Sequence, residues 1–165
     1  MKTTARPTDA FTLIELILVL ALLVVITSLA IPPMARFIRG RALDSETQRF
    51  VALAHAAQSR AVSEGMPMLL WVNAEGGSYG VTAETTGKEG DAKAETLMLD
   101  STLHLVVSRT SAAAPVQWKN LPAIRFLPDG TVDEDSALKV QLSDADGFQR
   151  LLVESENHTG YDVSD

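Results

Sequence analysis

Three histidines and a short acidic segment are the features of this 165-residue chain most able to bind a metal ion. His55, His104 and His158 lie far apart, and none has a carboxylate at the spacing of a metal-ligand pair. Asp144-Ala145-Asp146-Gly147 matches a fragment of a calcium-binding loop but lacks the bidentate glutamate that such a loop needs downstream. We therefore predict no metal site and no cofactor, and we interpret the acidic segment as a plain turn.

The residue patterns of common enzymes are missing from the sequence. It has no G-x-S-x-G motif, P-loop or dinucleotide fingerprint, and the lack of cysteine excludes disulfides and cysteine metal sites. Trp71 and Trp118 are expected to be core aromatic residues and not ligand platforms. Asp133-Glu134-Asp135 is expected to form a solvated loop, with a partner-binding surface as the alternative. We predict that the chain is not an enzyme.

Glu15 is the one charged residue in an otherwise apolar run from Phe11 to Ile31. As a helix with a rise of about 1.5 Å per residue, this run is long enough to cross a hydrocarbon core of about 30 Å. A carboxylate inside such a segment costs about 2.5–3.5 kcal/mol, so it is rarely retained without a function. The run therefore predicts a membrane-spanning helix in which Glu15 has a specific role.

Two simpler interpretations of the first thirty residues are open. Lys2 and Arg6 could form the basic region of a cleaved secretory signal, with Ser28-Leu29-Ala30 as its cleavage site. Against this, the apolar run is long for a signal, and Pro32 and Pro33 crowd the positions after that cut. A generic single-span anchor explains the length of the run but not the carboxylate.

The segment Ala10-Phe11-Thr12-Leu13-Ile14-Glu15-Leu16 resembles the cleavage motif of type IV pilins and pseudopilins. The resemblance implies that a prepilin peptidase cuts between Ala10 and Phe11, that Phe11 is then N-methylated, and that the apolar segment is kept. The family nearly always has glycine before the cut, so Ala10 predicts slower cleavage. Pro32 matches a proline that often interrupts the helix of the family.

The resemblance also implies a partner for Glu15. After cleavage the chain would begin with a free amine at Phe11, one helical turn from the carboxylate, and in the family this carboxylate pairs with the Phe11 amine of a neighbouring subunit. A buried pair shared by two chains favours correct register and disfavours a lone subunit. Pairing within one chain is the alternative.

The orientation in the membrane follows from the motif and not from the charges. Lys2 and Arg6 precede the apolar run and several arginines follow it, so the positive-inside rule gives no clear preference. The resemblance predicts a single-pass protein of the bacterial inner membrane, with its N-terminus in the cytoplasm and its head in the periplasm.

A second helical pattern follows the two prolines. Apolar residues recur at intervals of three, four and seven from Leu43 to Ala61, which gives one apolar stripe, while most charged residues occupy other faces. Gly65 and Pro67 mark the end of the helix at Glu64. The expected parts are a leader (1–10), a transmembrane helix (11–31), its amphipathic continuation (32–64) with a kink at Pro32 and Pro33, and a β-rich head (65–165).

The sequence of the head predicts short strands joined by turns. The expected strands are Met68–Asn73, Ser78–Thr82, Thr102–Ser108, Ala123–Leu127, Leu138–Leu142 and Gln149–Glu154. Residues 74–77 and 143–147 would close two hairpins, and residues 83–95 would form a loop or a mobile insertion. One long helix followed by antiparallel strands predicts an α+β fold, which is also the pilin plan.

Later motifs narrow the resemblance to the H-type minor pseudopilins of type II secretion systems. They are Arg60-Ala61, Ser63-Glu64-Gly65, Trp71 and Arg125-Phe126-Leu127-Pro128-Asp129-Gly130. The resemblance implies a structural subunit near the tip of the pseudopilus, which helps to drive folded exoproteins through the outer-membrane secretin. The implied partners are the prepilin peptidase, the major and other minor pseudopilins, the inner-membrane assembly platform and membrane lipid.

The charge of the head bears on the rival functions. Sixteen acidic and seven basic residues follow Gly65, so the head has a formal net charge of −9. This balance argues against nucleic acid as a partner, because nucleic-acid binding depends on neutralising phosphates. A minor pilin of a type IV pilus, in adhesion, twitching or DNA uptake, is the nearer alternative. A periplasmic binding protein with an ordinary signal is the more distant one.

Overall fold

The computed structural model describes residues 12–84, 90–109, 116–136 and 138–164, and gives residues 29–39 and 138 as backbone only. The chain divides into two units, Met1–Ile38 and Arg39–Asp165. The first unit holds the N-terminal part of helix α1 (Leu13–Glu64), and the second holds the rest of this helix and all the described strands.

Helix α1 ends where the sequence predicts. Its last residue is Glu64, and Gly65 takes a φ of +65°, the left-handed conformation that closes a helix at low steric cost. The predicted apolar stripe is confirmed, because none of its side chains is more than 2% exposed. These side chains are Leu43, Phe50, Ala54, Ala57 and Ala61. The stripe is rich in alanine, so the helix can approach the strands closely.

The described part of the head contains all six predicted strands and three that the sequence did not predict. The predicted ones are β1 (Met68–Asn73), β2 (Ser78–Ala83), β4 (Leu103–Arg109), β6 (Leu121–Phe126), β7 (Leu138–Asp144) and β8 (Gln149–Glu154). The additional ones are β3 (Glu95–Met98), β5 (Gln117–Trp118) and β9 (Tyr161–Ser164), and a 3₁₀ turn, η1, covers Glu134–Ser136. Each additional strand is short and lies at or beside a sheet edge.

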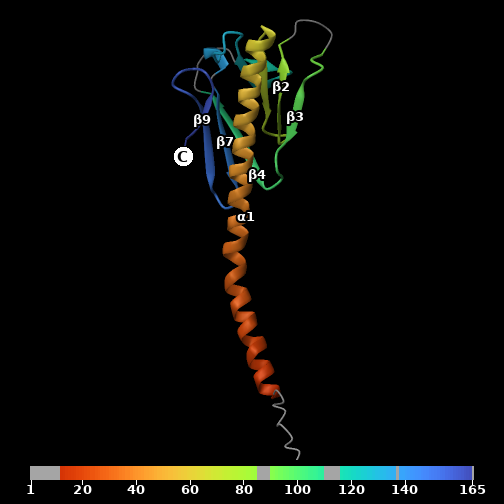
Figure 1. Ribbon diagram of the computed structural model, residues 1–165, viewed down its shortest axis with the longest axis vertical. Helices are drawn as coiled ribbons and strands as arrows, with labels where there is room; N and C mark the ends of the chain where they lie inside the picture. Colours follow the sequence, from red (N-terminus) through yellow and green to blue (C-terminus); the bar gives the residue numbers. More distant parts are fainter. Residues whose placement is uncertain (1–11, 85–89, 110–115, 137, 165) are drawn as a thin grey trace, which may run out of the picture. The chain divides into compact units, whose positions relative to one another are not determined.

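The described strands form two antiparallel sheets. One has the order β3-β2-β1-β6-β5 and the other the order β4-β7-β8-β9. Figure 1 shows β7 and β9 on one side of the Arg39–Glu64 part of α1, and β2 and β3 on the other side. This part of the helix therefore packs against both sheets.

The two predicted hairpins are confirmed. In the first, β1 pairs with β2 from Met68 opposite Ala83 to Asn73 opposite Ser78, and the Asn73 side chain accepts the Gly76 amide at 2.8 Å. In the second, β7 pairs with β8, and Asp144 Oδ1 accepts the amides of Asp146 and Phe148, each at 2.9 Å. The acidic segment 144–147 is thus a turn closed by its own carboxylate.

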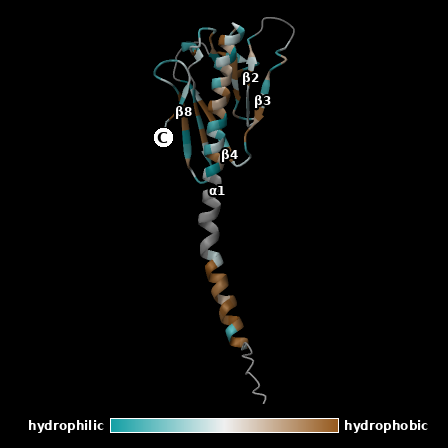
Figure 2. Cartoon of the chain, in the orientation of Figure 1, coloured by the Kyte–Doolittle hydropathy of each residue, from teal (hydrophilic) through white to brown (hydrophobic). Residues whose placement is uncertain are grey.

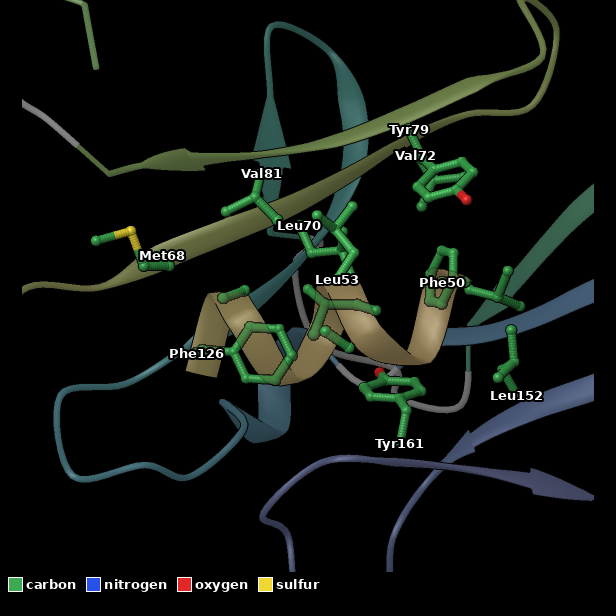
Figure 3. Packing of buried hydrophobic residues seen from close by; sticks show 14 of the residues in the cluster. Phe50, Leu53, Met68, Leu70, Val72, Tyr79, Val81, Phe126, Leu152 and Tyr161 are labelled. Atoms are coloured by element: carbon green, nitrogen blue, oxygen red, sulfur yellow. The ribbon is translucent and has the colours of Figure 1, made fainter. Parts of the chain in front are cut away.

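The core lies where the helical stripe meets both sheets. Phe50 and Tyr79 are fully buried, and their ring centroids are 5.1 Å apart. Figure 3 shows Leu70, Val72 and Val81 on one side of the helix, with Leu152 and Tyr161 on another. One long helix packed on antiparallel sheets makes this an α+β fold, as predicted.

The outer face of the first sheet carries a second, smaller apolar cluster. Trp71 is 6% exposed and stacks on Trp118, with 5.0 Å between the ring centroids and 20° between the ring planes. Lys119 and Asn120, both at positive φ, turn the chain between β5 and β6 and place Trp118 over this face. Trp71 is therefore a core residue, as predicted, while Trp118 is a partly buried cover.

Candidate assembly surfaces

The N-terminal unit presents an uncovered apolar helix. Every residue from Leu13 to Ser28 is exposed, and the large apolar side chains range from 48% exposed at Val19 to 76% at Leu13. Figure 2 shows this segment as strongly hydrophobic, with one hydrophilic interruption at its beginning. In the sequence, Glu15 is the one charged residue of the segment. Within the described residues, no helical stretch has both the length and the apolarity of a complete membrane span.

The predicted processing and assembly residues lie in or beside this unit. Ala10 and Phe11 are outside the described residues. Glu15 lies in the first turn of α1, where its amide donates to the Thr12 carbonyl at 3.1 Å. Pro32 and Pro33 lie within the helical backbone of α1. The cut, the N-methylation, the pairing of Glu15 with Phe11 and the kink therefore stay predictions.

A buried polar pair between the helix and the first sheet was not predicted from the sequence, which placed most charged residues of the helix away from its apolar stripe. Glu46 is only 7% exposed, and its Oε1 accepts a 2.6 Å hydrogen bond from the hydroxyl of Tyr79 on β2. Arg49 approaches its other oxygen at 3.5 Å. Burial, followed by the hydrogen bond to the Glu46 carboxylate, raises the pKa of Tyr79 well above its ordinary value. The pair joins the helix to the first sheet.

Tyr79→Phe is expected to lower the free energy of unfolding by about 2 kcal/mol, because it leaves a buried carboxylate oxygen without its donor. Urea unfolding of the intact protein in detergent measures this cost. In the matched double variant Tyr79→Phe/Glu46→Gln, the loss should be smaller than the sum of the single losses. If the loss in the double variant equals the sum of the two single losses, the coupling between Tyr79 and Glu46 is contradicted.

A second unpredicted contact ties the loop before β3 to the end of the helix. The Asp91 side chain is 7% exposed, accepts the amides of Ala83 and Lys93 at 2.8 Å each, and meets Arg60 Nη2 at 3.1 Å. Arg60 also contacts Glu64 at 3.2 Å. Burial raises the pKa of the Asp91 carboxyl, but the two amide hydrogen bonds and the Arg60 guanidinium outweigh it and hold that pKa below its ordinary value.

This lowered pKa predicts acid sensitivity. The stabilisation from Asp91 is complete above the ordinary carboxyl pKa of about 4 and is lost as the pH falls through the lower folded-state value. The free energy of unfolding should therefore fall below about pH 4, and Asp91→Asn should make this fall less steep. Asp162→Asn, at an exposed carboxylate on β9, is the matched control and should keep the wild-type pH dependence. Equal slopes for wild type and Asp91→Asn would contradict the assignment.

The motif at residues 125–130 contacts neighbouring loops, the core and the helix. Arg125 contacts Glu84 at 2.6 Å and Asp133 at 2.8 Å, and Phe126 is fully buried in the core. Gly130 closes the turn at a φ of +88°, and its carbonyl accepts a 2.8 Å hydrogen bond from the Gln58 side chain on the helix. The predicted acidic loop that follows is thus partly neutralised by Arg125.

The three histidines do not meet. His55 lies on the helix, His104 on β4, and His158 in the turn after β8, where its Nδ1 is 2.7 Å from Glu154 Oε1. Within the described parts of the chain, no group of three or more histidine, aspartate or glutamate residues is arranged to hold a metal ion.

Comparison with protein families decides the assignment. The model of the family described as type II transport protein GspH matches residues 46–156, which is well over half of the chain. The chain belongs to the GspH family. The match begins at the buried Glu46 of the helix and ends just after β8, so it spans most of the core, both hairpins and the segment at residues 125–130.

Solved structures of other proteins have the same fold. Two structures of the minor pseudopilin EpsH of the Vibrio cholerae type II secretion system match at 16% and 15% identity, with TM-scores of 0.51 and 0.56. They cover 76% and 78% of this chain and 94% and 99% of their own. The type IV minor pilin FimU of Pseudomonas aeruginosa matches at 17% identity with a TM-score of 0.53, covering 78% of this chain and 92% of its own. A search of curated protein sequences gives no match.

Membership of the GspH family gives the chain its general role. It is a type II transport protein with a pilin-like fold. The likeness to EpsH and FimU concerns the fold alone at these levels of identity.

Proposed function

We propose that this subunit is incorporated near the tip of the periplasmic pseudopilus, below the other minor pseudopilins and above the major one. There it supplies packing surface and position, and filament growth helps to push folded exoproteins through the outer-membrane secretin. The chain contributes no bond-making chemistry; it is itself the substrate of the prepilin peptidase.

Processing and anchoring follow the sequence motif in this proposal. The peptidase cuts between Ala10 and Phe11, and Phe11 is N-methylated. The apolar run 11–31 holds the subunit in the inner membrane, with the N-terminus in the cytoplasm and the head in the periplasm, until the assembly platform transfers it to the filament. Residues 32–64 continue the helix, with a bend at Pro32 and Pro33, into the head formed by residues 65–165.

The observation that carries the proposal is the exposed apolar helix with Glu15 as its one charge. Such a surface is stable only in lipid or against other apolar helices, and the two environments are those of a subunit before and after assembly. Glu15 then pairs with the Phe11 amine of a neighbouring subunit, because a carboxylate buried in a helical bundle needs an opposite charge.

The charge of the head argues against a pilin that takes up DNA. A pilin dedicated to DNA uptake needs a basic surface for phosphates, and this head has a formal charge of −9. A minor pilin of an adhesive or twitching pilus is the second candidate, because FimU, a type IV minor pilin, has the same fold.

Deletion of the gene separates the two candidates in a bacterium that has both machines. The proposal expects accumulation of exoproteins in the periplasm, with twitching motility unchanged, and restoration of release by the wild-type chain. Normal exoprotein release together with lost twitching would contradict the proposal and assign the subunit to a pilus.

A further inference from the structure

Strand β4 forms an open edge of the second sheet. It pairs with β7 along its whole length, from Leu103 opposite Asp144 to Arg109 opposite Leu138. Among the described residues, no strand pairs with its other side. The order β4-β7-β8-β9 therefore leaves β4 at one border of the sheet and β9 at the other (Figure 1).

The backbone groups that face this open side can be assigned from the hydrogen bonds. The Asp144 amide donates to the Phe148 carbonyl at 3.0 Å, so Asp144 directs its backbone groups toward β8. In an antiparallel pair, residues alternate between facing their partner strand and facing away from it. Leu103, opposite Asp144, therefore faces away from β7, and so do Leu105 and Val107. The Leu103 amide donates to the Asp100 carbonyl at 3.0 Å, so the N–H and C=O groups directed away from β7 and offered at the edge are those of Leu105 and Val107.

A groove runs along this edge. It consists of two adjoining hollows of about 470 and 390 Å³, which share Ala74, Glu75 and Leu105 as lining residues. The apolar part of its lining comes from both sheets, and in the larger hollow it consists of Val72, Leu105, Val106, Val107, Leu121 and Pro122. Val106 is 52% exposed in the middle of β4, where edge strands usually carry a charge that prevents further pairing.

The other edges are shorter or covered. β3 and β9 have four residues each and β5 has two, whereas β4 has seven. On β3, the Met98 carbonyl already accepts Arg49 Nη1 at 3.4 Å. Strand β4 is therefore the longest open edge that the structure describes.

The groove also has a charge preference. The carboxylate residues that line it are Glu75 and Asp100, and its lining includes no lysine or arginine. Backbone donors and acceptors repeated every second residue, beside apolar walls, fit an extended peptide that adds as a further strand. Two carboxylates on the rim favour a peptide with a basic residue.

We propose that the β4 edge binds an extended, apolar segment of a neighbouring pseudopilin, which pairs with the backbone of Leu105 and Val107 and directs a lysine or arginine to Glu75 and Asp100. The identity of the neighbour rests on the proposed function. The strand addition would join two heads directly, separately from the contacts of the N-terminal helices.

Residue-level amide hydrogen exchange tests this contact. The full-length chain is compared alone in detergent and in complexes purified from cells that co-express the pseudopilins of the same system. The amides of Leu105 and Val107 are expected to exchange at least about tenfold more slowly in the complexes. The amide of Val106, which faces β7, should be protected in both samples, and that of Val163 on β9 should not change.

A matched pair of variants adds a second readout. Val106→Lys and Val163→Lys each place a charge at an exposed valine of an edge strand in the same sheet, 52% and 45% exposed in the wild type. Val106→Lys is expected to abolish the added protection of Leu105 and Val107 and to reduce co-purification about tenfold. Val163→Lys should do neither.

Three results would overturn the inference. If the chain co-purifies with pseudopilins but Leu105 and Val107 exchange as fast as in the isolated protein, strand addition is wrong and the proposed function stands. If the chain does not co-purify at all, the proposed function fails and this inference fails with it. If protection appears in the isolated chain as its concentration rises, β4 pairs with a second copy and not with a neighbour of another kind.

Discussion

Glu15→Ala is expected to leave cleavage before Phe11 largely intact and to reduce incorporation into pseudopilin complexes about a hundredfold. The variant leaves the Phe11 amine of a neighbouring subunit without an opposite charge inside an apolar bundle. Removing one member of a buried ion pair costs about 3–5 kcal/mol, and each 1.4 kcal/mol is about tenfold in an equilibrium. Cleavage is measured from the size of the mature chain, and incorporation from its co-purification with the major pseudopilin.

Thr27→Ala is the matched control for this experiment. Thr27 is a polar residue of the same exposed segment, and its hydroxyl bonds within its own helix, to the Leu23 carbonyl at 2.8 Å. It should therefore assemble normally. Normal co-assembly of Glu15→Ala would refute the pairing, and loss of assembly in both variants would show a general sensitivity of the segment.

Gly80→Ala should be the most damaging single-methyl change in the head, with a loss of about 3 kcal/mol in the free energy of unfolding. A Cβ at residue 80 would overlap the Glu95 carbonyl of β3 and lie 2.7 Å from the Trp71 ring. The indole cannot withdraw freely, because it stacks on Trp118. The added methyl group must therefore displace β3 or break the aromatic stack, and urea unfolding of the intact protein measures the cost.

Gly90→Ala makes the same chemical change where no atom lies within 4 Å of the added Cβ. It should alter the unfolding free energy by less than about 0.5 kcal/mol. Equal stability of the Gly80→Ala and Gly90→Ala proteins would contradict the packing of Trp71 over β2.

The parts of the fold that could be predicted are those with a local signal. The stripe from Leu43 to Ala61 has helical spacing, and Gly65 with Pro67 forbids continuation, so both the buried face and the end of the helix followed from the sequence. The hairpin turns at residues 74–77 and 143–147 were likewise marked by glycine and aspartate. Local signals of this kind do not depend on the rest of the structure.

The missed features depend on partners that are distant in the chain. Strands β3, β5 and β9 have two to four residues each, too few for an alternating pattern to stand out. Glu46 is buried because Tyr79, on another element, offers it a hydroxyl. The Asp91 contact likewise depends on Arg60. A signal for β5 did exist in Lys119-Asn120, since asparagine tolerates the left-handed turn found there.

The assembly surfaces also divide into those with a local sequence signal and those that depend on distant parts of the chain. The motif at residues 10–16 predicts the cut, the methylated residue and the paired carboxylate, and the structure adds the exposed helix around Glu15. The groove along β4 could not be predicted, because it lies between the two sheets and its walls come from β1, β4 and β6.

The mass of the N-terminal peptide of the mature protein, purified from its own membranes, tests the central claim most directly. A pseudopilin processed as proposed begins at residue 11 with N-methylphenylalanine, and residues 1–10 are missing from it. A mature chain that begins at Ile31 with an unmodified amine would show that residues 1–30 are an ordinary secretory signal, and it would contradict the account.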